Sequence, residues 1–133
     1  KRVGKVVTAK TPAKRAKSRP KASQTPEKDI LRACLQLLAV HPAVAFAFRA
    51  NAGGMQNPVG QWVKFGFRGM PDILGMVKGG RFLAVEVKRP GKKPTPDQDA
   101  FLRRVNEAGG LGFCADSLAR LEFVLKWELD NTI

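Results

Sequence analysis

The feature that most constrains this chain is a pair of apolar segments joined by a glycine turn. Residues 73–77 and 82–88 are rich in strand-forming side chains, and Lys78-Gly79-Gly80-Arg81 joins them. Paired glycines supply the positive φ angles that a tight hairpin turn needs. Pro71 has a fixed φ and no N–H donor, so it suits the start of the first strand. The sequence therefore predicts an antiparallel hairpin over residues 72–88.

The charged residues of this hairpin fall at one end of it. Asp72 begins the first strand, and Glu86 and Lys88 lie at the end of the second. Because side chains alternate along a strand, Glu86 and Lys88 share one face with Ala84. Two carboxylates and an ammonium at the edge of an apolar sheet are costly unless they are paired or bind a metal. We interpret this edge as a candidate site.

The spacing of these residues resembles the PD-(D/E)xK nuclease signature, with Pro71-Asp72, then Glu86 and then Lys88. The surroundings are similar to a VRR-NUC domain of that superfamily, over roughly residues 25–125. The segments that carry this similarity are Arg49-Ala50-Asn51-Ala52-Gly53, Gly69-Met70-Pro71-Asp72, Glu86-Val87-Lys88 and Gln98 on a following helix. The resemblance implies a restriction-endonuclease-like core.

The remaining pattern agrees with that fold class. Helical periodicity begins after Thr25-Pro26, which we read as an N-cap followed by a first helical residue. Val44, Phe46 and Phe48 are expected on one face of a strand over residues 44–51, and a short strand is expected within residues 61–67. A capped helix after Thr95, a strand over 111–115 and a last helix follow. Residues 25–133 thus predict one α/β domain, a mixed central β-sheet flanked by helices.

Charge divides the chain into two parts. The net charge is +13, and residues 1–24 hold nine Lys or Arg and no Asp or Glu. That segment has almost no large apolar side chain after Val7, so we expect a basic, disordered tail that binds phosphates without sequence preference. The excess of positive charge favours a polyanionic partner such as DNA.

The acidic residues point to Mg²⁺, which prefers oxygen ligands and keeps several of its waters. We expect Asp72, Glu86 and the carbonyl of Val87 to bind Mg²⁺, with Mn²⁺ able to substitute. Lys88 would orient the attacking water or hold the scissile phosphate. The resemblance implies that Glu27, in the first helix, is a further catalytic residue and metal ligand.

Two of these candidates have alternative interpretations. The resemblance makes Gln98 a catalytic-site residue, but Gln98 also fits a capping box with Thr95. Glu27 can simply complement the positive end of its helix dipole. The residues expected to contact nucleic acid are Arg49, Asn51, Lys64, Arg68, Arg89, Lys92 and Lys93. Trp62 and Phe67 could stack on an unpaired base, or could be core residues.

Several classes of site are disfavoured. Cys34 and Cys114 are far apart and lack the further ligands of a zinc motif, so we expect reduced, buried thiols. His41, the single histidine, precedes a proline and is read as a turn residue. A signal peptide and a membrane span are not evident, so we expect a cytoplasmic or nucleoid-associated protein.

The sequence therefore suggests a Mg²⁺-dependent, structure-specific DNA endonuclease. Stand-alone VRR-NUC proteins resemble enzymes that act on branched DNA such as four-way (Holliday) junctions, whose two-fold symmetry suits a homodimer. One alternative is a non-catalytic, basic nucleic-acid-binding module. Another is a nuclease of the same chemistry that acts on flaps or linear DNA.

Overall fold

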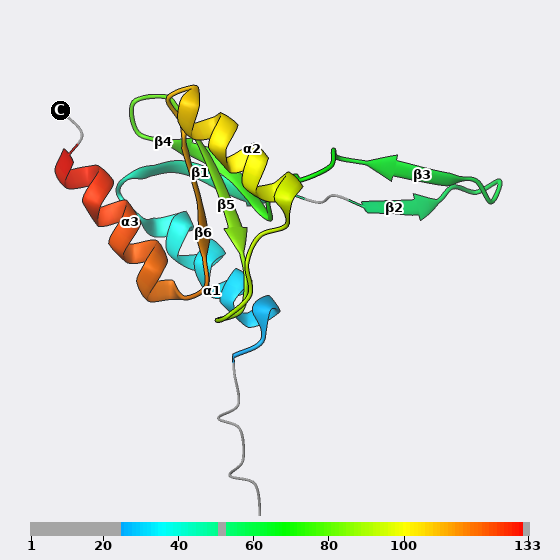
Figure 1. Cartoon of the computed structure of the whole chain (residues 1–133), viewed down its shortest axis with the longest axis horizontal. Coiled ribbons are helices and arrows are strands. Elements are labelled where there is room, and N and C mark those ends of the chain that lie inside the picture. The colour runs from blue at the N-terminus through cyan, green and yellow to red at the C-terminus, as the bar shows by residue number, and fades with distance from the viewer. Residues whose placement is uncertain (1–24, 51–52, 132–133) are drawn as a thin grey trace, which may run out of the picture.

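The computed structural model describes residues 25–50 and 53–131. The expected basic tail, residues 1–24, and Asn51 lie outside the described residues. The elements are α1 (Glu27–Val40), β1 (Val44–Arg49), β2 (Gly53–Gln56), β3 (Trp62–Phe65), β4 (Ile73–Val77), β5 (Arg81–Val87), α2 (Pro96–Glu107), β6 (Leu111–Ala115) and α3 (Leu118–Asn131) (Figure 1).

A four-stranded sheet in the order β1-β4-β5-β6 forms the body. The predicted hairpin is confirmed: β4 and β5 are antiparallel, with Val77 opposite Arg81 and with Gly79 and Gly80 at positive φ in the turn. β6 runs parallel to β5, and α2 makes the crossover that a parallel pair requires. The sheet is therefore mixed, as predicted.

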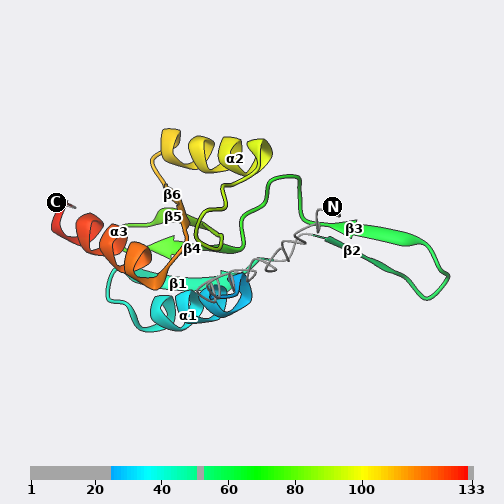
Figure 2. The ribbon, with the colours of Figure 1, turned by 60° about the horizontal axis from the view of Figure 1, so that its bottom comes forward.

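Helices cover both faces of the sheet (Figure 2). α1 and α3 lie on one face, over a core that includes Leu83, Val85 and Val87 of β5. α2 lies on the other face, where Leu102 and Val105 pack against Ala84. Because β5 is buried on both faces, the carboxylate near its end lies in an apolar surrounding. The predicted fold class, a mixed sheet flanked by helices, is confirmed.

Two local predictions are wrong. α1 has Pro26, not Thr25, at its N-cap position, and proline has no side-chain acceptor for the free N–H groups of the first turn. Val44 does not share a face with Phe46 and Phe48, because a register shift lies between Val44 and Phe46. Val44 instead packs with Ala47 against the α1 side of the core. A bulge of this kind reverses the alternation on which the prediction rested.

The segment between β1 and β4 forms an element that the sequence did not reveal. We predicted one short strand within residues 61–67, but β2 and β3 pair with each other as a separate two-stranded sheet. This hairpin, which we call the arm (residues 53–65), projects from the body (Figure 1). Its root is held at the sheet, where the Ala50 N–H donates to the Asp72 carbonyl at 2.7 Å.

Candidate active site

The start of β4 and the end of β5 bring Asp72 and Glu86 to the same edge of the sheet. Antiparallel pairing sets Ile73 opposite Val85. Asp72, which precedes Ile73, therefore lies beside Glu86, which follows Val85. Asp72 Oδ2 accepts a hydrogen bond from the Val87 N–H at 2.8 Å. This bond fixes the Asp72 carboxylate against the backbone that carries Glu86.

Glu86 is the central group of this edge. Its side chain is only 2% exposed, and its Oε1 has two partners. Lys88 Nζ lies 3.3 Å from Oε1, and Gln98 Nε2 donates to the same oxygen at 3.1 Å. The second oxygen, Oε2, is buried and accepts no hydrogen bond from the described residues. A buried carboxylate oxygen without a donor is unfavourable unless a proton or a cation meets it.

Burial, and secondly the neighbouring Asp72 carboxylate, raise the pKa of Glu86 to about 7. The Lys88 ammonium acts in the opposite direction but is the weaker influence. The positive charge of Lys88 therefore does not offset the effects of burial and of Asp72 on Glu86. A strongly perturbed carboxyl beside a second carboxylate is typical of catalytic and metal sites.

Gln98 fulfils both of the roles between which the sequence left a choice. Its Oε1 accepts from the Thr95 N–H at 2.9 Å, and its own N–H donates to Thr95 Oγ1 at 3.3 Å. These two bonds form the predicted capping box of α2. The amide nitrogen is left for Glu86. The two ends of one side chain thus join the helix N-terminus to the buried carboxylate.

Glu27 reaches the same region from α1. It lies in the first helical turn, and together with Lys88, Arg89 and Lys92 it lines a cavity of about 510 Å³. The cavity lies between the start of α1 and the loop after β5. An acid and three cations therefore meet around a space that adjoins Glu86 through Lys88.

The other predicted nucleic-acid contacts are on the surface. Arg49, Lys64, Arg68, Arg89, Lys92 and Lys93 are all exposed. Arg49 pairs with Ile73, so it lies at the catalytic end of the sheet, whereas Lys64 lies on the arm. Arg68 Nε is 3.7 Å from Asp97 at the start of α2.

A family comparison adds independent information. The VRR-NUC domain matches residues 49–117, just over half of the 133 residues. The chain belongs to the VRR-NUC domain family. Membership implies a nuclease-type function and a fold of the PD-(D/E)xK type. A comparison with curated proteins found no match.

The VRR-NUC match includes the edge described above but not α1. Asp72, Glu86, Lys88 and Gln98 fall inside residues 49–117, whereas Glu27 falls outside. Our expected similarity over residues 25–125 was therefore wider than the match. The family supports a nuclease without assigning a role to each of these side chains.

Asp72 and Glu86 fit a divalent cation, although the described residues contain no group of three or more His, Cys, Asp or Glu arranged to hold a metal. Mg²⁺ commonly uses only one or two carboxylates and keeps waters in its remaining positions. The unpartnered Oε2 of Glu86 and the nearby Asp72 carboxylate are oxygen ligands of that kind.

Sequence reasoning missed one neighbour of the VRR-NUC site. Parallel pairing sets Cys114 of β6 beside Glu86. Burial, and secondly the Glu86 carboxylate, raise the pKa of this half-buried thiol to about 11. Cys114 is therefore a neutral thiol there, and only the strand order could have revealed its position.

The two cysteines and the single histidine have no proposed catalytic role. Cys34 is buried as predicted, whereas Cys114, also predicted to be buried, is only half-buried; both are free thiols. His41 lies in a turn and its Nδ1 accepts from the Ala43 N–H at 3.1 Å. None of the described helices is long and apolar enough to cross a membrane.

Proposed function

We propose that this VRR-NUC chain is a Mg²⁺-dependent, structure-specific DNA endonuclease that hydrolyses phosphodiester bonds. The observation that carries the proposal is the buried Glu86, with a pKa near 7, beside Asp72 and within 3.3 Å of Lys88. A module that only bound DNA would gain nothing from two carboxylates near a phosphate, because like charges repel.

The cation would be held by Asp72, Glu86 and the carbonyl of Val87, and Glu27 is the candidate for holding a second one. Bound Mg²⁺ or Mn²⁺ neutralises charge on the scissile phosphate and makes a bound water more acidic. The Val87 N–H and Gln98 keep the two carboxylates in place through the bonds at 2.8 and 3.1 Å. Rigid support of this kind lowers the cost of assembling the site.

Lys88 acts at the reacting phosphate. Its side chain is 16% exposed, so it lies at the boundary between Glu86 and the cavity that Glu27, Arg89 and Lys92 line. From there the ammonium can contact a phosphate oxygen or orient the attacking water. Its contact with Glu86 limits its freedom, which favours positioning and electrostatic stabilisation over free acid–base exchange.

DNA would approach through the basic residues around this cavity. Arg89, Lys92 and Lys93 follow the catalytic strand, and Arg49 lies at the same sheet end. Asn51, Lys64 and Arg68 are the further proposed contacts. Phosphate contacts position a duplex without reading its sequence. Recognition by shape is therefore favoured, and branched DNA such as a four-way junction is the proposed substrate, cut by a homodimer.

Cleavage assays on linear, flapped and four-way DNA test the proposal. Asp72→Ala and Glu86→Ala should each abolish Mg²⁺- and Mn²⁺-dependent cleavage, while DNA binding is kept or tightened because negative charge has been removed. Glu107→Ala, which removes an exposed carboxylate at the far end of α2, is the matched control. Full cleavage by either site variant would remove the proposed metal site and favour the non-catalytic module.

The form of the products tests the junction assignment. A homodimer should linearise a cruciform plasmid by paired nicks on opposing strands, whereas uncoupled cutting first gives the relaxed circle. A monomer that cuts linear duplex as readily as junctions would leave a general nuclease or a flap nuclease in place of a resolvase.

A further inference from the structure

The arm has one apolar face and one polar face. The register sets Gly53 opposite Phe65 and Met55 opposite Val63, so Met55, Val63 and Phe65 share a face. Lys64, Gln56 and Trp62 share the other, where the Trp62 ring lies over Gly54. Met55 is 62% exposed, and Val63 and Phe65 are 45% and 41% exposed. An isolated two-stranded hairpin is at best marginally stable in water, so an exposed apolar face here indicates a missing partner.

The sheet also has an uncovered apolar surface, on the side where α2 lies. Phe46 pairs with Met76, which pairs with Phe82, and Phe48 lies in the next cross-strand row. α2 packs mainly on β5 and β6 and leaves the β1 side of this face open. Phe46 and Phe48 are each 52% exposed and Phe82 is 45% exposed. We call Phe46, Phe48 and Phe82 the aromatic face.

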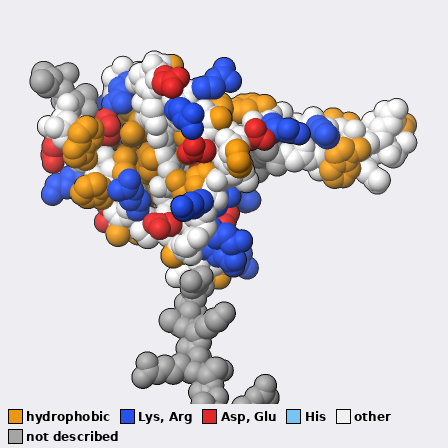
Figure 3. Space-filling model, in the orientation of Figure 1, with side chains coloured by type: hydrophobic (Ala, Val, Ile, Leu, Met, Phe, Trp, Pro, Cys, Tyr) orange, Lys and Arg blue, Asp and Glu red, His pale blue; other side chains and the backbone are white. Residues whose placement is uncertain are grey.

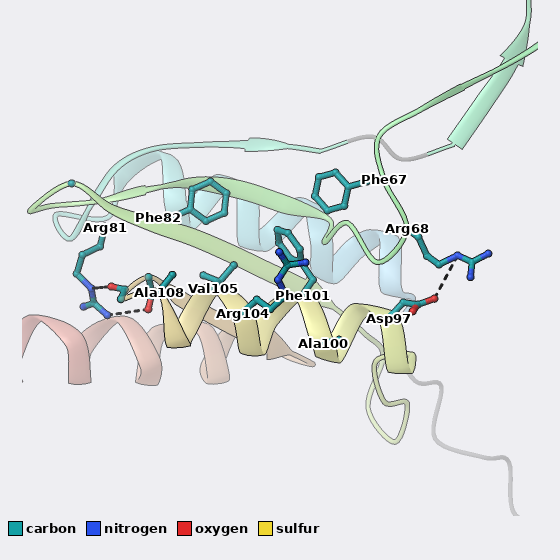
Figure 4. A pocket seen from close by; sticks show the side chains of 13 residues that line it. Phe67, Arg68, Arg81, Phe82, Asp97, Ala100, Phe101, Arg104, Val105 and Ala108 are labelled. Carbon is teal, nitrogen blue, oxygen red and sulfur yellow. Dashed lines mark hydrogen bonds and ion pairs between the residues drawn. The ribbon is translucent and has the colours of Figure 1, made fainter.

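A groove continues from the aromatic face to the root of the arm. It has a volume of about 1040 Å³, and the rings of Phe67, Phe82 and Phe101 lie in it between the sheet and α2 (Figure 4). Phe67, at the arm root, is 48% exposed although its ring centroid is 4.9 Å from that of Phe101. Apolar side chains are also visible along the arm and at its root (Figure 3). The groove thus connects Phe82 of the aromatic face with Phe67 at the arm root.

Charge argues against DNA as the occupant of the arm face and the aromatic face, whereas the adjoining groove is also lined by Arg68, Arg81 and Arg104. Lys64 is the only charged residue among residues 53–67, and it lies on the opposite face of the arm from Met55. Phosphate binding depends on cations, and six apolar side chains offer none. The arm face and the aromatic face match each other in chemistry, yet the arm points away from its own body (Figure 1).

We propose that the apolar face of the arm docks on the aromatic face and the adjoining Phe67 of a second copy of this chain, and that the arm of the second copy docks in the same way on the first. This contact supplies the interface of the proposed homodimer, so the inference rests on the homodimer part of the proposed function. Such a reciprocal contact is closed and two-fold symmetric. It leaves the face with Lys64 and Trp62 free for DNA.

The exposed area is sufficient for such a dimer. Seven side chains, those of the arm face, the aromatic face and Phe67, are 41–62% exposed. Aromatic side chains bury about 200 Å² each when fully covered. Covering these seven in both copies would then bury on the order of 1,200 Å², the lower bound of a specific interface.

A second apolar surface provides the control. Phe123 and Trp127 on α3 are 63% and 55% exposed. α3 lies on the opposite face of the sheet from α2 (Figure 2). A substitution there perturbs an equally apolar surface without touching the arm or the groove.

Sedimentation of the full chain, without DNA or metal, tests the contact. The unchanged protein should sediment as a dimer at micromolar concentration. Met55→Lys and Phe46→Glu should each weaken association at least tenfold, with circular dichroism unchanged, whereas Phe123→Glu should not. Mixing the Met55→Lys and Phe46→Glu chains should restore a dimer, because one contact then joins the unchanged arm and face and the other joins opposite charges.

Four results would overturn the proposal. These are a monomeric unchanged protein, dissociation by Phe123→Glu alone, failure of the mixed variants to associate, and a Met55→Lys variant that loses DNA affinity but remains a dimer. Because the sedimentation assay contains no DNA, it tests the interface separately from cleavage. A dimer that fails to cleave junctions would not contradict the proposed interface. A monomer that cleaves DNA would contradict only the interface.

Discussion

At the scale of single residues, Glu86 determines how the site responds to pH. Its pKa rises from 4.5 to about 7 because burial and then Asp72 disfavour the charged form. The metal-free folded protein therefore binds this proton more tightly than the unfolded chain does. The resulting stability is fully present below about pH 4.5 and is lost as the pH rises through about 7. A cation that binds the ionised carboxylate should reverse that loss.

We predict that Glu86→Gln stabilises the metal-free protein at pH 8, because it removes a buried charge, and has little effect at pH 5. The gain at pH 8 should be on the order of 1–3 kcal/mol. Mg²⁺ or Mn²⁺ should raise the melting temperature of the unchanged protein at pH 8 and leave that of Glu86→Gln unaffected. Urea unfolding at both pH values checks this, with Glu107→Gln as the control. An equal effect at pH 5 and pH 8 would show that Glu86 does not titrate as argued.

At the scale of elements, the arm is separate from the core that supports the site. None of residues 53–65 belongs to the described hydrophobic clusters, whereas Phe67 contacts α2. The hydrogen bond from the Ala50 N–H to the Asp72 carbonyl holds together the two ends of the segment between β1 and β4. Gly69 has φ +79°, and a Cβ there would lie 2.4 Å from the Asp97 carbonyl, so the arm root contacts the start of α2 closely.

We predict that replacing residues 53–66 with a short Gly-Ser linker leaves the body folded. The free energy of unfolding should change by less than about 1 kcal/mol, because shortening a loop alters its closure entropy only slightly. The replaced chain should sediment as a monomer. Urea unfolding and sedimentation measure the two effects. A body that no longer folds would show that the arm stabilises the sheet.

At the scale of the whole molecule, the groups proposed for catalysis and DNA contact gather at one end. Asp72, the end of β5 and the arm root lie at the same sheet edge, and the cavity beside Lys88 brings the start of α1 to it. The basic tail precedes α1 directly in the sequence. We propose that the tail extends the phosphate contacts outward from this end.

We predict that deleting residues 1–24 leaves cleavage chemistry intact and weakens DNA binding in a salt-dependent way. Each phosphate that the tail neutralises contributes about 0.9 to the slope of log K against log salt concentration. Binding titrations of both chains over a range of salt concentrations measure the difference. Equal slopes would show that the tail does not contact DNA.

Local patterns predicted much of the body. Turn glycines, a proline before a strand and strand alternation are short-range signals, and they gave the β4–β5 hairpin and placed Asp72, Glu86 and Lys88 at one end of it. The capping box marked the start of α2, and the apolar run over residues 111–115 matched β6. These features depend on backbone geometry within a few residues, so neighbours in sequence suffice to specify them.

The sequence by itself determined the strands of the β4–β5 hairpin, the cap of α2 and the order of the charged residues along them. Only the tertiary structure decided that Glu86 is buried, that Gln98 completes the capping box of α2 and contacts Glu86 at once, and that Cys114 lies beside Glu86. It also decided that the aromatic face is exposed, because the pattern of β1 does not reveal how far α2 extends across the sheet. Burial and strand order arise from contacts between residues distant in sequence, and alternation along one strand carries no record of them.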